Sequence, residues 1–152
     1  MVPSPVSDAS TTPFTPARFV RTPVFWGLVF GVANVVLPFG FWWLGLSTVH
    51  ALAISLIAAV YIGFAVADGR PTVIAIEVVI AGVFVVIAAA GVTSTAWLLV
   101  VGFAGHGVKD AWQERRHFVA NTRWWPPFCA AVDLLVAAVL IVEIAAGFHF
   151  HN

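Results

Sequence analysis

Ionisable side chains lie inside long apolar stretches of this sequence, and their spacing indicates that some of them act together. His106 and Asp110 are four residues apart, and Cys129 and Asp133 repeat this spacing in a later stretch. Residues four positions apart lie on one face of a helix. Glu77 lies in a third apolar stretch. An ionisable side chain in a membrane helix costs about 2.5–3.5 kcal/mol on insertion scales, so each of these residues calls for a functional explanation.

If the helices that carry these residues pack together, the side chains form one polar cluster. Histidine and carboxylate groups are ligands of divalent metals, and a bound metal can activate water for hydrolysis or hold a phosphate. The candidate metal ligands are His106, Asp110, Asp133 and Glu77, and the candidate cofactor is a divalent metal ion. His117 and Cys129 are expected at the edge of the cluster.

Two other interpretations of the cluster remain open. It could bind protons, because carboxylates that lie close together cannot all ionise cheaply. It could also be a structural network that holds the helices in register. Cys129 is in addition a candidate nucleophile with His106 or His117 as its base, although a buried cysteine is more often an apolar filler.

A second, looser group of polar residues belongs to the other end of the helices. His50 begins one apolar stretch, and Glu143 lies late in the last one, so the two could pair. His149 and His151 follow at the end of the chain and could bind a metal weakly.

The composition indicates that these residues belong to a membrane protein. Of the 152 residues, 61% are hydrophobic and only 9% are charged, against roughly 45–50% and about 25% in a typical soluble domain. A compact domain of this length has too little interior to bury so much apolar surface. This excludes an ordinary water-soluble enzyme, a nucleic-acid-binding protein and a disordered regulator. The single cysteine also excludes an intramolecular disulfide.

The apolar residues are organised into five runs that follow a Ser-, Thr- and Pro-rich segment. Residues 1–20 are expected to form a flexible N-terminal tail, and residues 21–152 a transmembrane domain. A helix needs about 20 apolar residues to cross a bilayer. The fourth run meets this requirement only if its helix continues through Lys109 and Asp110. The predicted spans are 24–44, 49–67, 72–90, 94–110 and 128–148.

The basic residues favour five spans over four. With five spans, all seven Lys and Arg residues fall on one face of the membrane: Arg18, Arg21, Arg70, Lys109, Arg115, Arg116 and Arg123. The positive-inside rule then places the N-terminus in the cytoplasm and the C-terminus outside. The predicted fold is therefore an all-α, five-transmembrane-helix bundle.

Three finer features of this bundle can be predicted. Gly27 and Gly31 form a GxxxG motif that permits close helix contact, either inside the bundle or in a dimer. Pro38 is expected to kink the first span. The fourth helix is expected to continue beyond the membrane and to end near residues 121–122.

The function that fits these features best is that of a non-catalytic accessory or partner-binding protein in a bacterial plasma membrane. One alternative is a membrane-embedded, metal-dependent enzyme that acts on a lipid or isoprenoid. Another is a subunit of a proton- or ion-coupled carrier. The expected partners are the lipid bilayer and either another membrane protein or a second copy of the chain, but not nucleic acid.

Overall fold

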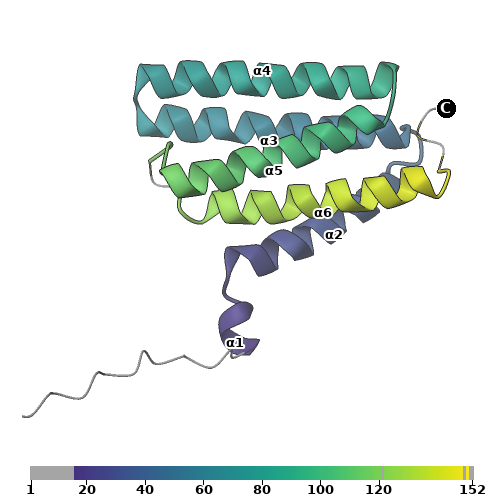
Figure 1. The fold of residues 1–152 in the computed structure, drawn as a ribbon, viewed down its shortest axis with the longest axis horizontal. Coiled ribbons are helices and arrows are strands. Elements are labelled where there is room, and N and C mark those ends of the chain that lie inside the picture. The colour runs from purple at the N-terminus through teal and green to yellow at the C-terminus, as the bar shows by residue number, and fades with distance from the viewer. Residues whose placement is uncertain (1–15, 121, 149, 151–152) are drawn as a thin grey trace, which may run out of the picture.

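The computed structural model describes residues 16–120, 122–148 and 150, and its regular structure there is entirely helical (Figure 1). Residues 1–15 of the expected tail lie outside the described residues, and the rest of the tail includes a four-residue helix. The helices are α1 (Pro16–Phe19), α2 (Pro23–Gly40), α3 (Leu46–Asp68), α4 (Pro71–Thr93), α5 (Trp97–Arg116) and α6 (Trp125–Ala145).

Four of these helices are long and apolar enough to cross a membrane. They are α2, α3, α4 and α6, which correspond to the first, second, third and fifth predicted runs. The fourth predicted run corresponds to α5, whose 20 residues include the polar segment from Lys109 to Arg116. Helix α5 is therefore long enough but less apolar than the other four.

Turn-forming residues determine where several helices begin and end. The Thr22 hydroxyl accepts a hydrogen bond from the backbone N–H of Phe25 at 3.2 Å and caps α2. Gly69 ends α3 in the left-handed conformation, with φ of 82°, and Pro71 follows in the first turn of α4. The chain therefore reverses direction between α3 and α4 within two residues.

Two predicted helix ends were wrong. Helix α2 stops at Gly40 rather than at residue 44, because Pro38 lies in its last turn and the N–H of Phe41 bonds to the Pro38 carbonyl at 3.1 Å. Pro38 lies inside α2, in its last turn. Helix α5 stops at Arg116, short of residues 121–122, because His117 adopts a left-handed conformation with φ of 49°.

The helices pack as two pairs that α5 joins. Helix α3 lies alongside α4, and α2 lies alongside α6. Helix α5 packs along α6 on one side and against α4 and α3 on the other (Figure 1). The apolar core between them includes Ile54, Leu99, Phe103, Val136 and Leu140, each at most 1% exposed. Helix α5 therefore brings its polar residues to the centre of the bundle.

The GxxxG motif lies at the contact between α2 and α6. A Cβ atom at Gly31 would lie 2.9 Å from the side chain of Leu135, and one at Gly27 would clash with the Phe128 carbonyl. Only glycine permits the two backbones to approach this closely. Within this chain the motif therefore serves packing inside the bundle.

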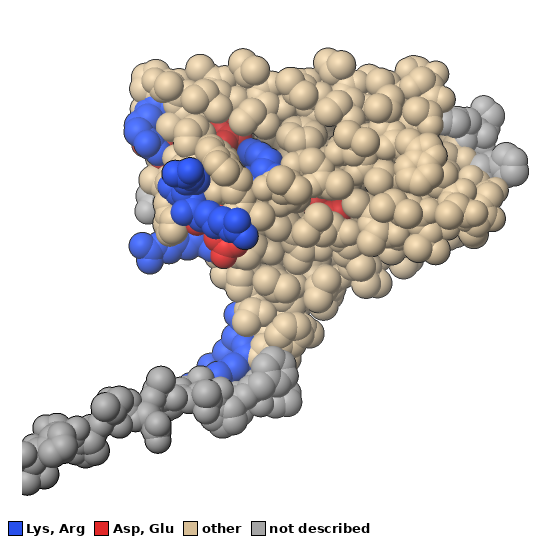
Figure 2. All heavy atoms as spheres, viewed as in Figure 1, with Lys and Arg blue, Asp and Glu red and all other residues tan. Residues whose placement is uncertain are grey.

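The exterior of the bundle is apolar except at one end. Leu56, Val79 and Val86 are each more than 60% exposed, which fits contact with lipid rather than water. Figure 2 shows Lys and Arg side chains gathered where α5 ends and α6 begins, with the opposite end lacking them in this view. We call the Lys- and Arg-bearing end the basic end.

Candidate functional site

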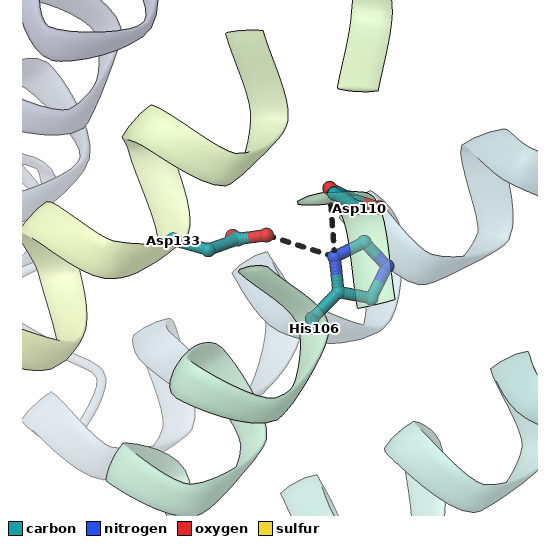
Figure 3. A group of neighbouring side chains, drawn as sticks. All are labelled: His106, Asp110 and Asp133. Carbon is teal, nitrogen blue, oxygen red and sulfur yellow. Dashed lines mark hydrogen bonds and ion pairs between the residues drawn. The ribbon is translucent and has the colours of Figure 1, made fainter. Parts of the chain in front are cut away.

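Three polar side chains from α5 and α6 converge inside the bundle, towards its basic end (Figure 3). The Nδ1 atom of His106 lies 2.8 Å from Oδ2 of Asp133 and 3.3 Å from Oδ2 of Asp110. All three residues are fully buried, at 0% exposure. One histidine nitrogen therefore faces two carboxylates in a region without access to bulk solvent.

A second group of polar side chains adjoins this one. The ammonium of Lys109 lies 3.0 Å from Oε2 of Glu77 and 3.9 Å from Oδ1 of Asp110. The Gln113 amide donates a hydrogen bond to Oε1 of Glu77. The Lys109 ammonium also lies 3.4 Å from the centre of the Tyr61 ring, within the range of a cation–π interaction. Lys109 thus links Glu77 on α4 to the carboxylate of Asp110.

The sequence of α5 explains how these groups meet. His106, Asp110 and Gln113 follow the i, i+4, i+7 pattern of a single helix face, and all three are buried. Gly107 allows this face to approach α6, because a Cβ atom there would lie 3.0 Å from Cγ of Leu134 and 3.3 Å from Cβ of Asp133. A side chain at position 107 would push Asp133 away from His106.

Several buried polar atoms of the cluster have no hydrogen-bond partner among the described residues. They include both carboxylate oxygens of Asp110, Oδ1 of Asp133, Nε2 of His106 and the Tyr61 hydroxyl. A buried polar group without a hydrogen bond loses its hydration without replacement, which costs roughly 1–3 kcal/mol and more for a charged group. The oxygens of Asp110 do lie near basic groups, at 3.3 Å from Nδ1 of His106 and 3.9 Å from Nζ of Lys109, so the acceptor without any such neighbour is Oδ1 of Asp133.

The formal charges of the cluster do not balance. Glu77 and Lys109 form an ion pair and cancel one another. If both Asp110 and Asp133 are ionised, they leave two negative charges with a neutral His106, or one with a protonated His106. Buried charges are normally paired or coordinate a metal. One divalent cation bound to neutral His106 and the two aspartates gives a neutral group.

The geometry of the three side chains also suits a metal ion. One ligand atom from each of His106, Asp110 and Asp133 can be chosen so that all three lie within 4.8 Å of one another. Ligands at 2.0–2.1 Å from a tetrahedral metal lie about 3.3 Å apart. The separation of 3.3 Å between Nδ1 of His106 and Oδ2 of Asp110 equals this value, and the 2.8 Å to Oδ2 of Asp133 is a hydrogen-bond distance that would lengthen around a metal. An imidazole with two carboxylates suits a first-row divalent metal such as Zn²⁺ or Mn²⁺.

The other candidate residues have different positions. Glu77 reaches the three side chains only through Lys109. Cys129 is a buried free thiol one turn before Asp133 on α6. His117 is exposed at the end of α5. The three residues at the centre of the cluster are therefore His106, Asp110 and Asp133.

The residues proposed at the opposite end do not form a pair. His50 is buried, and its ring packs edge-on against Phe103 with 6.2 Å between ring centroids. Glu143 is partly buried, and no ion pair joins it to His50 in the described part of the chain. His149 and His151 lie outside the described residues.

Sequence reasoning missed three contributors to the site. Gln113, Tyr61 and Lys109 were not named as candidate site residues, although the spacing does extend the face of His106 and Asp110 to Gln113. The position of Gln113, seven residues after His106, was a signal that it shares the buried face. The contact of Lys109 with Glu77 depends on the packing of α5 against α4, and spacing within α5 does not reveal it.

A second group of hydrogen bonds, which we call the clamp, joins Asp68 and Arg70 to the α5–α6 connection and was not predicted from the sequence. The Asp68 carboxylate accepts hydrogen bonds from the Arg70 guanidinium and from the N–H of Ala120 at 2.6 Å. Arg70 also donates to the carbonyl of Phe118 at 2.7 Å. Hydrogen bonding to Asp68 raises the pKa of Arg70 above its ordinary value, which keeps the guanidinium charged. The clamp ties the α5–α6 connection to the α3–α4 connection.

Comparisons with protein-family models, with curated proteins and with solved structures gave no match to this chain.

Proposed function

We propose that this chain is a five-span plasma-membrane protein that binds one divalent metal ion through His106, Asp110 and Asp133. The observation that carries the proposal is the convergence of these three fully buried side chains, whose ligand atoms lie within 4.8 Å of one another. The bound metal neutralises the two aspartates and joins α5 to α6. The protein serves as an accessory or partner-binding component of a bacterial membrane.

The length and packing of α5 support its assignment as the fourth of the five spans. Its 20 residues correspond to about 30 Å of helix, the thickness of the hydrocarbon core. Its polar residues His106, Asp110 and Gln113 are buried, whereas Val101 and Val108 are exposed and apolar. The low apolarity of α5 thus comes from a stripe that faces protein, together with a charged last turn.

The distribution of charge supports the orientation. The basic end carries the Lys and Arg side chains and faces the cytoplasm under the positive-inside rule (Figure 2). The N-terminus is then cytoplasmic and the C-terminus extracytoplasmic. The metal lies inside the membrane, towards the cytoplasmic face.

Complete burial of the three ligands favours a stabilising metal over a catalytic one. Structural zinc sites have four protein ligands, whereas catalytic sites have three and keep an open position, so the ligand number here is that of a catalytic site and only the burial argues against catalysis. His106, Asp110 and Asp133 are each 0% exposed, so a substrate has no direct access from solvent. The metal-dependent enzyme and the ion-coupled carrier both require an opening of the bundle to reach these residues.

Elemental analysis of protein purified in detergent tests the proposal. The wild type and Glu143→Gln, a matched carboxylate control on the same helix, should each contain a stoichiometric divalent metal. Asp133→Asn and His106→Ala should lose it. A wild-type protein that stays metal-free after incubation with Zn²⁺ and with Mn²⁺ would overturn the metal site, as would equal metal content in all four proteins.

A further inference from the structure

A cavity at the basic end, separate from the three candidate ligands, collects charged side chains that have no ion-pair partner. The cavity is open, has a volume of about 1280 Å³ and lies between the last turn of α5 and the start of α6. Glu114 and Arg115 line it from α5, and Arg123 and Trp124 line it from the segment before α6. Within the described residues, none of these three charged side chains takes part in an ion pair.

The cavity also contains a buried acceptor. Gln113 lines it and is only 2% exposed, with its amide N–H₂ donating to Glu77. The Oε1 atom of Gln113 has no hydrogen-bond partner in the described part of the chain. A buried amide oxygen without a donor is costly, so a ligand that donates a hydrogen bond there would be stabilised.

We infer that this cavity binds a zwitterionic group consisting of a phosphate and a primary ammonium, as in the headgroup of phosphatidylethanolamine. The guanidinium groups of Arg115 and Arg123 suit the phosphate, because arginine presents a planar set of donors that matches phosphate oxygens. The carboxylate of Glu114 and the amide oxygen of Gln113 suit the ammonium, which has three N–H donors and no acceptor.

The location of the cavity favours a lipid as the source of this group. The inference rests here on the proposed function, because five spans place the basic end at the level of the cytoplasmic headgroups. Trp124 is 43% exposed beside the cavity, and tryptophan is enriched at this interface. A lipid bound there keeps its acyl chains in the bilayer while its headgroup enters the cavity.

The charges also distinguish between lipids. An anionic headgroup without an amine would leave Glu114 unpaired beside added negative charge. A choline headgroup carries a quaternary ammonium without N–H donors and cannot hydrogen-bond to the exposed carboxylate of Glu114. The cavity should therefore prefer phosphatidylethanolamine to phosphatidylglycerol and to phosphatidylcholine.

Native mass spectrometry of the whole protein, equilibrated with an equimolar mixture of these three lipids with identical acyl chains, tests the inference. The wild type should retain phosphatidylethanolamine preferentially. Arg115→Ala or Arg123→Ala should each weaken its retention by about tenfold, through loss of a charge-assisted contact to the phosphate. Glu114→Gln should abolish the preference over phosphatidylcholine. Arg116→Ala is the matched control, because Arg116 is exposed in the same helical turn but does not line the cavity.

Two results would overturn the inference: equal retention of all three lipids by the wild type, or the same loss in Arg116→Ala as in Arg123→Ala. Competition with soluble phosphoethanolamine identifies the source of the group. If phosphoethanolamine at the same concentration as the lipid displaces it, the cavity binds the headgroup chemistry but its natural ligand is soluble. If the lipid stays bound, the ligand comes from the membrane. Metal content is measured on the same preparations, and span number by cysteine labelling of intact cells. A five-span, metal-loaded protein without lipid preference contradicts this inference and leaves the proposed function intact.

Discussion

Oδ2 of Asp133 lies 2.8 Å from Nδ1 of His106, and this contact joins α6 to α5 across 27 residues of sequence. Both side chains are fully buried, and Asp110 brings a second carboxylate to the same nitrogen at 3.3 Å. A single N–H on Nδ1 cannot satisfy two carboxylates fully. One of the two carboxylates is therefore left without a full partner, and a bound cation would supply the missing interaction. This is the physical basis of the proposed metal site.

Removal of the metal should destabilise the wild type. Ligand binding stabilises a folded protein by about 2.7 kcal/mol when the free ligand is at 100 times its Kd. Thermal unfolding in detergent, followed with excess Zn²⁺ and with a chelator, should therefore give a lower midpoint in the chelator.

Asp133→Asn should respond differently to the chelator. This substitution keeps the shape of the side chain and removes one buried negative charge, so its unfolding midpoint should be the same with and without metal. In the chelator the unfolding midpoint of Asp133→Asn should equal or exceed that of the wild type, because the substitution removes a buried charge that has no full partner. A variant midpoint that still falls on chelation would show that the metal binds elsewhere.

Lys109→Met should destabilise the bundle by leaving Glu77 without its cation. Loss of one partner from a buried ion pair costs about 3–5 kcal/mol. The double variant Lys109→Met with Glu77→Gln should recover most of this loss, since no uncompensated charge is left. Unfolding free energies of the four proteins in a double-mutant cycle measure the coupling, and additive effects would contradict the pairing.

Gly107→Ala should weaken the contact between α5 and α6. The added Cβ atom would lie 3.0 Å from Leu134 and 3.3 Å from Asp133, and such overpacking costs about 1–3 kcal/mol. Gly82→Ala is the control, because a Cβ atom at Gly82 on α4 meets nothing within 4 Å. The control should be neutral or slightly stabilising in unfolding assays, and equal losses in both variants would argue against the close approach.

Cysteine labelling tests the five spans. In a Cys129→Ala background, Ser94→Cys and Ala146→Cys should react with a membrane-impermeant maleimide added outside intact cells. Ala120→Cys should react only after the membrane is opened. All three native residues are exposed in the structure. Reaction of Ala120→Cys and Ser94→Cys from the same side would show that α5 does not cross.

Much of the helical framework could be predicted from local sequence. Apolar runs of sufficient length, bounded by residues such as Gly69 and Pro71, correctly indicated α3 and α4. The end of α2 at Gly40 was not predicted, because its apolar run continues to residue 44. The early end of α5 depended on His117 adopting a conformation that non-glycine residues rarely take, and no sequence pattern indicated it.

The sequence predicted the members of the cluster on the condition that their helices pack together, but it predicted geometry only within one helix. The spacing of His106 and Asp110 placed them on one face, and they lie 3.3 Å apart. Their contacts with Asp133 and Glu77 depend on which helices are neighbours and how close they come. That distance is controlled by Gly107, whose role becomes evident only when α6 is seen against it.

X-ray absorption spectroscopy of the Zn²⁺-loaded protein tests the metal site most directly. The proposed ligands predict a shell of nitrogen and oxygen atoms at about 2.0–2.1 Å from the metal. The outer-shell scattering of one imidazole should also be present in the wild type and absent in any metal-bound fraction of His106→Ala. A sulfur shell at about 2.3 Å, which would implicate Cys129, or a spectrum unchanged by His106→Ala would contradict the proposed site.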